Sequence, residues 1–240
     1  MNNTISIRPG LITFRGGAFD ASPHAHHAIQ VVKQENGSVM TCQIDGETIT
    51  SDVVIAPDIT HELRLKQGLV VLVEPQSVVG QKLMDYLGKR EYRVIESSDP
   101  FSAAGCDIST GILSNAGRSD AEESQVPVPL DTRIQSLISR LDLCLQGECI
   151  KPSHWKAAEV ADELAISESR FLHLFREQMG VAWRPYLLWR RLICALMAMQ
   201  MGAKATDAAY RAGFSDSAHL SRSFRQNFGM SIREASRLFS

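Results

Sequence analysis

The sequence lacks the long apolar run that a membrane-spanning helix requires. Such a helix needs about 18 consecutive apolar residues, and no stretch of the 240-residue chain approaches this length. The opening MNNTISIRPG has neither the basic nor the apolar segment of a secretory signal peptide. We therefore expect a cytoplasmic protein that makes no contact with a membrane.

The sequence also contains little cysteine. Its five cysteines are odd in number and scattered, unlike a zinc framework or a set of disulfides, so we expect reduced thiols that pack in the interior. A glycine-rich phosphate loop, a nucleophile with a nearby base and a pair of catalytic carboxylates are all missing. These absences favour a protein that is not an enzyme.

The net charge of −2 hides a difference between the two parts of the chain. Residues 131–240 contain 15 Lys and Arg against 11 Asp and Glu, which gives a net charge of +4. Residues 1–130 contain 10 against 16, which gives −6. The basic excess of the C-terminal part permits binding to DNA through phosphate neutralisation without demonstrating it.

The N-terminal part is rich in short β-branched or alternating runs, separated by turn residues. The expected strands are 5–7, 11–14, 29–33, 39–44, 47–50, 53–56, 62–65 and 69–73. Between two of them, Asp45-Gly46 predicts a two-residue hairpin turn, because Gly tolerates the positive φ that a type I′ turn demands. We expect a compact antiparallel sandwich or barrel, followed by a helix over Val78–Leu87.

The composition then changes twice. Residues 114–130 are small, polar, acidic and proline-bearing, which is typical of a linker. Beyond them, apolar residues recur with the helical period on one face. These residues are Ile134, Leu137, Ile138, Leu141 and Leu145. We therefore predict a first domain over residues 1–113, a linker over 114–130 and a second domain over 131–240.

The second domain contains an internal repeat of a helix, a tight turn and a second helix. Phe175 and Gly180 of the first copy correspond to Phe224 and Gly229 of the second, where the turn is one residue longer. Each copy predicts a helix-turn-helix unit. A helix of about 17 residues between them would be about 26 Å long. Because successive major-groove faces are about 34 Å apart, this helix could hold two recognition helices in neighbouring grooves.

The same region resembles the DNA-binding domain of the arabinose-regulator (AraC/XylS) family. The matching stretches are DTRIQSLISRL, VADELAISESRFLHLFREQMG, YLLWRRLICAL and AAYRAGFSDSAHLSRSFRQNFGMS. The resemblance implies an all-α domain of two helix-turn-helix subdomains joined by a linker helix. It also implies a sequence-specific transcription regulator whose partners are double-stranded promoter DNA and, for an activator, RNA polymerase.

The resemblance also implies positions that contact DNA. Base-reading sites of the family fall on Ser169, Leu172, His173, Ser217, Ala218, Ser221 and Arg222. Arg222 is the strongest candidate, because a guanidinium can bond guanine O6 and N7 together. Candidate phosphate contacts are Lys156, Arg176, Arg184, Arg190, Arg191 and Arg225. Each of these alone is as well explained by a solvated surface charge or a structural ion pair.

Some residues depart from the family pattern. Ser223 replaces an apolar core residue, while Ile232 and Ala235 stand where the family usually has proline and an aromatic residue. These departures predict a weakened core in the second helix-turn-helix unit and a poorly anchored last helix.

The N-terminal segments GAFDASPHAHHAIQVVKQENG and VVIAPDITHEL resemble the cupin barrel that commonly precedes this DNA-binding domain. The resemblance places His24, His26, Gln30 and His61 close to the metal-ligand positions of metal-binding cupins, where they could hold Zn²⁺, Fe²⁺ or Ni²⁺. Against this, Gln30 stands where a carboxylate is usual. We expect no cofactor, with these side chains lining the barrel mouth or bonding the backbone, and we expect His27 to be exposed on the opposite face.

These observations predict a two-domain regulator. Its mainly β, cupin-like first domain would sense a small-molecule effector or pair two protomers into a homodimer, with the segment Val78–Tyr92 as the interface. Two alternatives remain open. One is a metal-dependent cupin enzyme with an attached helical domain, and the other is a protein-interaction module whose helix-turn-helix units no longer contact DNA.

Overall fold

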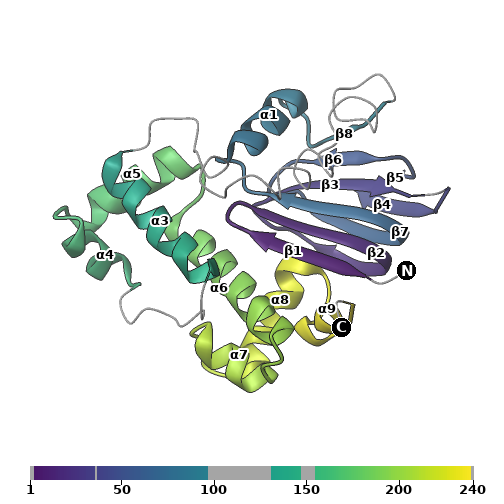
Figure 1. Cartoon of the computed structure of the whole chain (residues 1–240). Coiled ribbons are helices and arrows are strands. Elements are labelled where there is room, and N and C mark those ends of the chain that lie inside the picture. Colours follow the sequence, from purple (N-terminus) through teal and green to yellow (C-terminus); the bar gives the residue numbers. More distant parts are fainter. Residues whose placement is uncertain (1–2, 36, 97–130, 147–154, 239–240) are drawn as a thin grey trace. The chain divides into compact units, whose positions relative to one another are not determined.

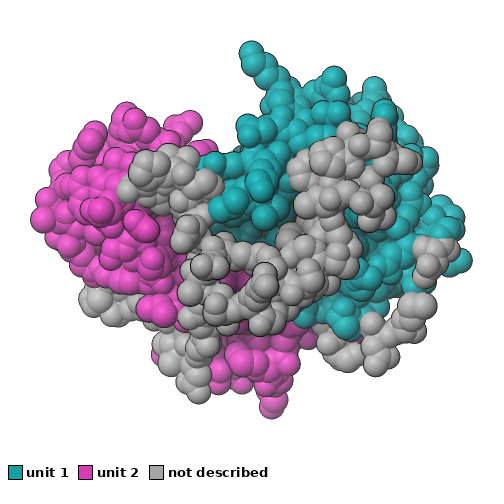
Figure 2. Space-filling model, turned by 45° about the horizontal axis from the view of Figure 1, so that its top comes forward, with its two compact units in different colours: residues 1–6, 10–127 teal, residues 7–9, 128–240 magenta. Residues whose placement is uncertain are grey.

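The computed structural model describes residues 3–35, 37–96, 131–146 and 155–238. They belong to two compact units, one containing residues 1–6 and 10–127 and the other containing residues 7–9 and 128–240 (Figure 2). Residues 97–130 lie outside the described part, so the boundaries predicted near 113 and 131 and the linker between them stay predictions. The described part contains no helix that is long and apolar enough to span a membrane.

The first unit is built on an eight-stranded sheet (Figure 1). Its strands are β1 (Thr4–Arg8), β2 (Leu11–His24), β3 (Ile29–Gln34), β4 (Met40–Ile44), β5 (Glu47–Ile49), β6 (Val53–Ile55), β7 (His61–Val73) and β8 (Tyr92–Val94). The strand order is β1-β2-β7-β3-β6-β8, and β4 pairs with β7 and β5. Among the described strands the sheet stays open, so the expected closed barrel is not seen.

The long strand β7 organises this sheet. Along one edge it pairs with β2, and along the other its first residues pair with β4 and its last residues with β3, in each case antiparallel. The sequence predicted two separate strands here, over 62–65 and 69–73. Instead, Gly68 pairs with Gly16 inside the β2–β7 ladder. A Cβ on Gly68 would lie 2.1 Å from the carbonyl oxygen of Lys33, so the glycine permits a close backbone approach within a continuous strand.

Two local predictions for the first unit are confirmed. Asp45 and Gly46 have φ values of 48° and 81°, as a type I′ turn between β4 and β5 requires. Helix α1 (Val78–Leu87) begins after Ser77, whose hydroxyl accepts a hydrogen bond from the Gly80 N–H at 3.0 Å.

Helix α1 uses its apolar side within the first unit. Leu83 and Leu87 are buried in one core cluster with Ile29, Val31 and Val54 of the sheet. These two leucines therefore belong to the core of the first unit itself. The homodimer interface that we predicted over Val78–Tyr92 stays a prediction.

The second unit is helical. Its elements are α3 (Thr132–Gln146), α4 (Ala157–Glu163), α5 (Glu168–Met179), α6 (Trp183–Gln200), α7 (Ala205–Arg211), α8 (Ser217–Phe228) and α9 (Ile232–Leu238). The pairs α4–α5 and α7–α8 are the two predicted helix-turn-helix units, and α6 is the linker helix between them (Figure 1). The five apolar residues that predicted α3 are all buried.

Helix α6 is packed by aromatic side chains from both helix-turn-helix units. Near its start, the Trp183 ring lies with its centroid 5.0 Å from that of Phe175 and 5.3 Å from that of Phe171. Further along, Trp189 stacks on Phe228 at 5.3 Å. Because α6 is buried on both sides, it forms the common core of the unit.

The last helix is better anchored than the sequence predicted. Ile232 and Ala235 of α9 are 1% and 3% exposed, so small apolar side chains fill the space that the family fills with other residues. Ser223 is buried as predicted, beside the stacked rings of Phe224 and Phe228, whose centroids are 4.3 Å apart.

The cysteine prediction is correct at one described position and wrong at another. Cys42 is a buried free thiol, and burial raises its pKa to about 12. Cys194 on α6 is disulfide-bonded, and its partner lies outside the residues whose side chains are described. The expectation of five reduced thiols therefore fails at Cys194.

The two helix-turn-helix turns place different residues at the same strained position. Ala165 in the first turn and Gly213 in the second have φ values of 55° and 76°, in the left-handed region. A Cβ is unfavourable there, whereas glycine adopts this conformation readily. We expect Ala165→Gly to raise the free energy of unfolding of the second unit by about 0.5–1 kcal/mol, and Gly213→Ala to lower it by about 1 kcal/mol or more.

Urea unfolding followed by tryptophan fluorescence measures both changes, because Trp155, Trp183 and Trp189 all lie in this unit. Equal destabilisation by the two substitutions would show that helix propensity, rather than the backbone conformation of the turn, decides the outcome.

Candidate nucleic-acid interface and histidine cluster

The second helix of each helix-turn-helix unit begins at a side-chain cap. The Ser167 hydroxyl accepts a hydrogen bond from the Arg170 N–H at 3.2 Å at the start of α5. The Asp216 carboxylate accepts one from the His219 N–H at 2.7 Å at the start of α8. Both helices end at a glycine in the left-handed conformation, Gly180 and Gly229. The two candidate recognition helices therefore have matching, well-defined ends.

The predicted base-reading residues lie on the outer faces of these two helices. On α5, Ser169, Leu172 and His173 are exposed, while Phe171 and Phe175 on the opposite face are buried. The spacing of three and four residues places the exposed side chains on one face. Leu172 is 37% exposed, so an apolar side chain stands at the centre of this face.

The outer face of α8 is more polar. Ala218 and Arg222 are exposed, and Ser217 and Ser221 are half-buried beside them. Within the described part of the chain, the Arg222 guanidinium forms no hydrogen bond or ion pair with another side chain. Its donors are therefore available to a ligand. The structure contains no DNA, so base reading by these seven residues stays a prediction.

Four of the candidate phosphate contacts are exposed cations. Lys156, Arg176, Arg184 and Arg225 all lie on the surface of the second unit. Lys156 is 3.7 Å from Glu159 and Arg225 is 3.5 Å from Glu234, measured between charged groups. Exposed ion pairs of this length contribute little and are easily exchanged for a phosphate.

Arg190 has a different role from the one predicted. It is 3% exposed, and its Nη2 lies 2.5 Å from Oδ1 of Asp142 on α3. The guanidinium therefore joins α6 to α3 inside the unit and is withdrawn as a phosphate contact. The signal that the sequence offered was Asp142 within the apolar pattern of α3, but its partner is 48 residues away.

Arg191, the next residue, contacts the second helix-turn-helix unit, at the turn between α7 and α8. Its Nε donates to the carbonyl oxygen of Ala212 at 2.8 Å, and Nη2 donates to that of Gly213. Its guanidinium also lies 4.3 Å from the centroid of the Phe214 ring. These carbonyls follow the end of α7 and have no helical partner, so Arg191 stabilises the turn that orients α8. Its principal role is structural, which sequence alone could not distinguish from phosphate binding.

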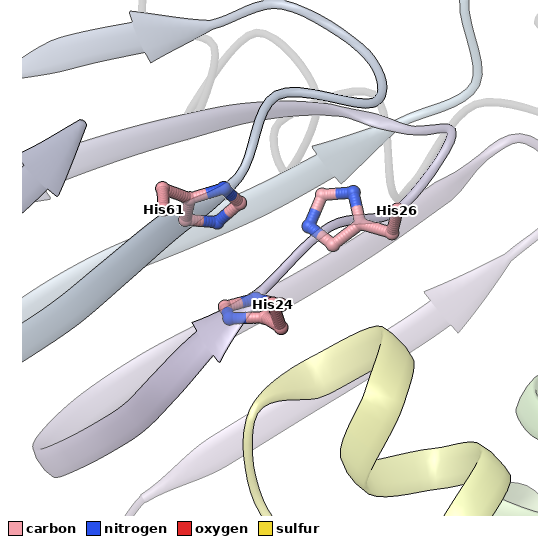
Figure 3. A group of neighbouring side chains, drawn as sticks. All are labelled: His24, His26 and His61. Carbon is pink, nitrogen blue, oxygen red and sulfur yellow. The ribbon is translucent and has the colours of Figure 1, made fainter. Parts of the chain in front are cut away.

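A second candidate site lies in the first unit, where three histidines meet. His24 ends β2, His26 follows it in the loop, and His61 begins β7. The register of the sheet pairs His24 with His61. The three side chains surround a common space (Figure 3), and one potential ligand atom from each lies within 4.8 Å of the others.

The hydrogen bonds of the three rings follow one pattern. Nδ1 of each ring faces a backbone carbonyl oxygen, at 2.9 Å for His24, 3.0 Å for His26 and 2.8 Å for His61. These carbonyls accept hydrogen bonds, so each Nδ1 carries the proton. In a neutral ring this leaves Nε2 as the atom with a lone pair.

Gln30 completes the group. It is 2% exposed in the middle of β3, and its Oε1 lies 3.2 Å from Nε2 of His26. The structure therefore brings together all four residues that the sequence singled out.

The sequence prediction was wrong for His27. We expected this residue on the solvent side, but it is 7% exposed. Residues 25–28 lie between β2 and β3 rather than in a strand, so the alternation of faces does not apply to them.

Burial keeps all four histidines neutral. It lowers the pKa of His24 to about 3, with the neighbouring His61 and His26 lowering it further. It also lowers the pKa values of His26, His27 and His61 to about 4. The charged form is disfavoured because a buried imidazolium loses its hydration. At neutral pH the cluster is a set of uncharged nitrogen donors.

Comparison with known proteins assigns the C-terminal part to a family. Residues 160–237 match the family described as "Helix-turn-helix domain". The HTH-type transcriptional activator RhaS of Escherichia coli is 34% identical over 109 residues, which cover 44% of this chain and 38% of RhaS. These matches support the predicted resemblance of residues 131–240 to the DNA-binding domain of the AraC/XylS family. The matched region covers less than half the length of RhaS.

The whole chain also resembles solved structures of ToxT from Vibrio cholerae. An apo ToxT structure matches with a TM-score of 0.52 at 15% identity, covering 100% of this chain and 99% of ToxT. A second ToxT structure, bound to a methylnaphthalenyl butenoic acid, matches with a TM-score of 0.51 at 12% identity, covering 100% and 98%. At this identity the likeness shows the fold, with a sheet-rich N-terminal part and a helical C-terminal part.

The buried ion pair of the second unit gives one testable consequence. Arg190→Ala leaves the Asp142 carboxylate largely buried without its partner, so we expect the free energy of unfolding of the second unit to fall by about 3 kcal/mol. Arg184→Ala removes an exposed arginine from the same helix and should change it by less than about 0.5 kcal/mol. Urea unfolding followed by tryptophan fluorescence compares the two. Equal effects would show that the ion pair does not stabilise the domain.

The buried histidines predict a pH-dependent stability of the first unit in the presence of a chelator. Their folded-state pKa values lie below the ordinary 6.5, so their contribution to stability is complete above about 6.5 and is lost as the pH falls toward 4. Each group contributes a slope of up to about 1.4 kcal/mol per pH unit.

Hydrogen exchange of β2, β3 and β7 at pH 7.5 and 5.5, corrected for the intrinsic rate, measures this loss. The tryptophan signal of the second unit provides the internal control. Unchanged protection of the sheet at the lower pH would contradict the burial of neutral imidazoles.

Proposed function

We propose that this protein is a sequence-specific DNA-binding transcription regulator. The observation that carries the proposal is the arrangement of two helix-turn-helix units on one shared helix, α6, with the outer faces of α5 and α8 exposed. This arrangement supports binding by one chain at two successive sites on double-stranded DNA. The name of the relative RhaS, a transcriptional activator, agrees with this role.

The length of α6 supports a two-groove contact. Its 18 residues correspond to about 27 Å at about 1.5 Å per residue. Successive major-groove faces are separated by about 34 Å, which is close to the length of this helix. Because Arg190 and Arg191 join α6 to α3 and to the α7–α8 turn, the spacing is held by the core of the unit.

The chemistry of the two faces supports unequal contributions to specificity. Arg222 on α8 can make a bidentate bond to guanine O6 and N7. The face of α5 offers Leu172, which can contact a thymine methyl group, and His173, whose Nδ1 is 3.7 Å from Glu177. We therefore propose that α8 supplies most of the base discrimination.

We further propose that the first unit receives the signal that controls DNA binding, and that its sheet is of the cupin type. The long antiparallel pair of β2 and β7, with β3 and β4 on the far edge of β7, supports the cupin-like topology. The buried histidine cluster supports a ligand site in this unit. A ligand would act by favouring one of two arrangements of the chain that differ in affinity for DNA. An activator of this type would also contact RNA polymerase.

Selection of bound sequences from random double-stranded DNA by the full chain tests the main proposal. We expect two short motifs about one helical turn apart. Failure to enrich any sequence at low salt would overturn the proposal and favour a protein-interaction module.

Substitution of Arg222 tests its part in recognition. We expect Arg222→Ala to cost about 1–3 kcal/mol of binding free energy and to relax specificity within one motif, because a base contact is lost. Arg225→Ala should weaken binding to all sequences alike and reduce the salt dependence by about one ion. Lys82→Ala, on α1, removes a charge far from either recognition helix in sequence and serves as the control. An unchanged motif in Arg222→Ala would exclude this residue from base reading.

A further inference from the structure

We propose that His24, His26 and His61 bind a divalent transition-metal ion, with Zn²⁺ as the representative. This inference goes beyond the proposed DNA-binding function and rests on the first unit alone. The three ligands come from the end of β2, the loop after it and the start of β7. The sheet therefore brings together residues that are far apart in sequence, as Figure 3 shows.

The hydrogen bonds orient the rings as ligating histidines are oriented in metal sites. A metal-bound imidazole usually donates its other N–H to a carbonyl or carboxylate, which fixes the ring and its tautomer. Here the carbonyl oxygens of Ser22, Ala28 and Ile59 take that part. They are backbone atoms at strand ends, so the fold itself sets the ring orientations.

The distances between the ligand atoms are close to those of an occupied metal site. A Zn–N bond is about 2.0–2.1 Å, so two nitrogens on one ion lie at most about 4.2 Å apart. The ligand atoms of the cluster lie within 4.8 Å of one another. On binding an ion, the outermost of these nitrogens would therefore have to move together by several tenths of an ångström.

One buried nitrogen of the cluster lacks the partner that an ion-free site would need. Nε2 of His61 is buried without a hydrogen-bond partner among the described residues. An unsatisfied buried polar atom costs free energy, so its presence calls for an explanation. A metal ion at the centre of the cluster would accept the lone pair of His61 Nε2.

The contact between His26 and Gln30 points the same way. His26 faces two acceptors, the Ala28 carbonyl oxygen at Nδ1 and Gln30 Oε1 at Nε2, but a neutral imidazole has one N–H. A metal ion resolves the conflict, because both Nε2 and Oε1 can donate lone pairs to it. Their separation of 3.2 Å is the separation of neighbouring ligands on one ion. Rotation of the Gln30 amide by a half-turn is the metal-free solution, and the experiment below distinguishes the two.

The donor set selects the class of metal. Three imidazoles and an amide oxygen favour Zn²⁺, Ni²⁺ or Co²⁺ over Mg²⁺ and Ca²⁺, which prefer sites of oxygen ligands.

Titration calorimetry of the chelator-treated full chain with Zn²⁺, and with Mg²⁺ as the comparison, tests the proposal. We expect saturable binding of one Zn²⁺ per chain and no binding of Mg²⁺. His61→Asn keeps a side-chain N–H that can reach the Ile59 carbonyl and removes Nε2. It should weaken Zn²⁺ binding by at least about 100-fold, more than loss of an outer partner would.

Two further variants make the test specific. Gln30→Glu supplies a negatively charged ligand and should tighten binding by at least about tenfold, a gain that damage to the fold cannot produce. His173→Ala removes an exposed histidine of α5 and should leave the affinity unchanged. Absence of saturable Zn²⁺ binding, equal binding by His61→Asn and the unchanged chain, or no gain in Gln30→Glu would overturn the proposal. DNA binding that persists in His61→Asn would leave the proposed function intact.

Discussion

The burial of α6 between two helix-turn-helix units is the interaction on which the second unit depends. A helix that is apolar on more than one side is stable only when neighbours cover each side. Trp183 is covered by Phe171 and Phe175 of the first helix-turn-helix unit, and Trp189 is covered by Phe228 of the second helix-turn-helix unit. Removal of either neighbour would expose aromatic surface, so the two units cannot separate without loss of the core. One continuous helix thereby fixes the distance between the recognition helices, a distance that simpler DNA-binding proteins set by dimerisation.

The two helix-turn-helix units differ in core packing and in the chemistry of their outer faces. The first has the larger aromatic core, yet its turn holds Ala165 in a left-handed conformation and its outer face carries Leu172. The second has a glycine at the equivalent turn position and Arg222 on its outer face, yet it buries the polar Ser223. Apolar packing and outer-face chemistry therefore differ between the two helix-turn-helix units.

Local patterns predicted most of the elements, and long-range contacts explain the failures. The helical period and the repeat predicted every helix-turn-helix element of the second unit, because amphipathic helices carry their burial in their own sequence. The joined strand β7 was missed because Gly68 has the same appearance in a turn as in a close approach to Lys33. Arg190 and Arg191 are neighbours in sequence, but they lie about 100° apart around a helix of ~3.6 residues per turn. Their opposite partners, Asp142 and the end of α7, are set by tertiary structure alone.

The sequence named the members of the histidine cluster. It could not distinguish a metal site from a set of polar residues that satisfy one another's hydrogen bonds, because the distinction depends on where the protons of the imidazole rings lie. Each Nδ1 faces a backbone carbonyl, so the tautomer is fixed by the main chain. Of the remaining atoms, Nε2 of His26 faces Gln30 Oε1, and Nε2 of His61 has no hydrogen-bond partner among the described residues. A cluster of satisfied residues would have alternated donors with acceptors. Under the proposed metal site, a cation would accept lone pairs of the imidazoles, which a buried space solvates poorly.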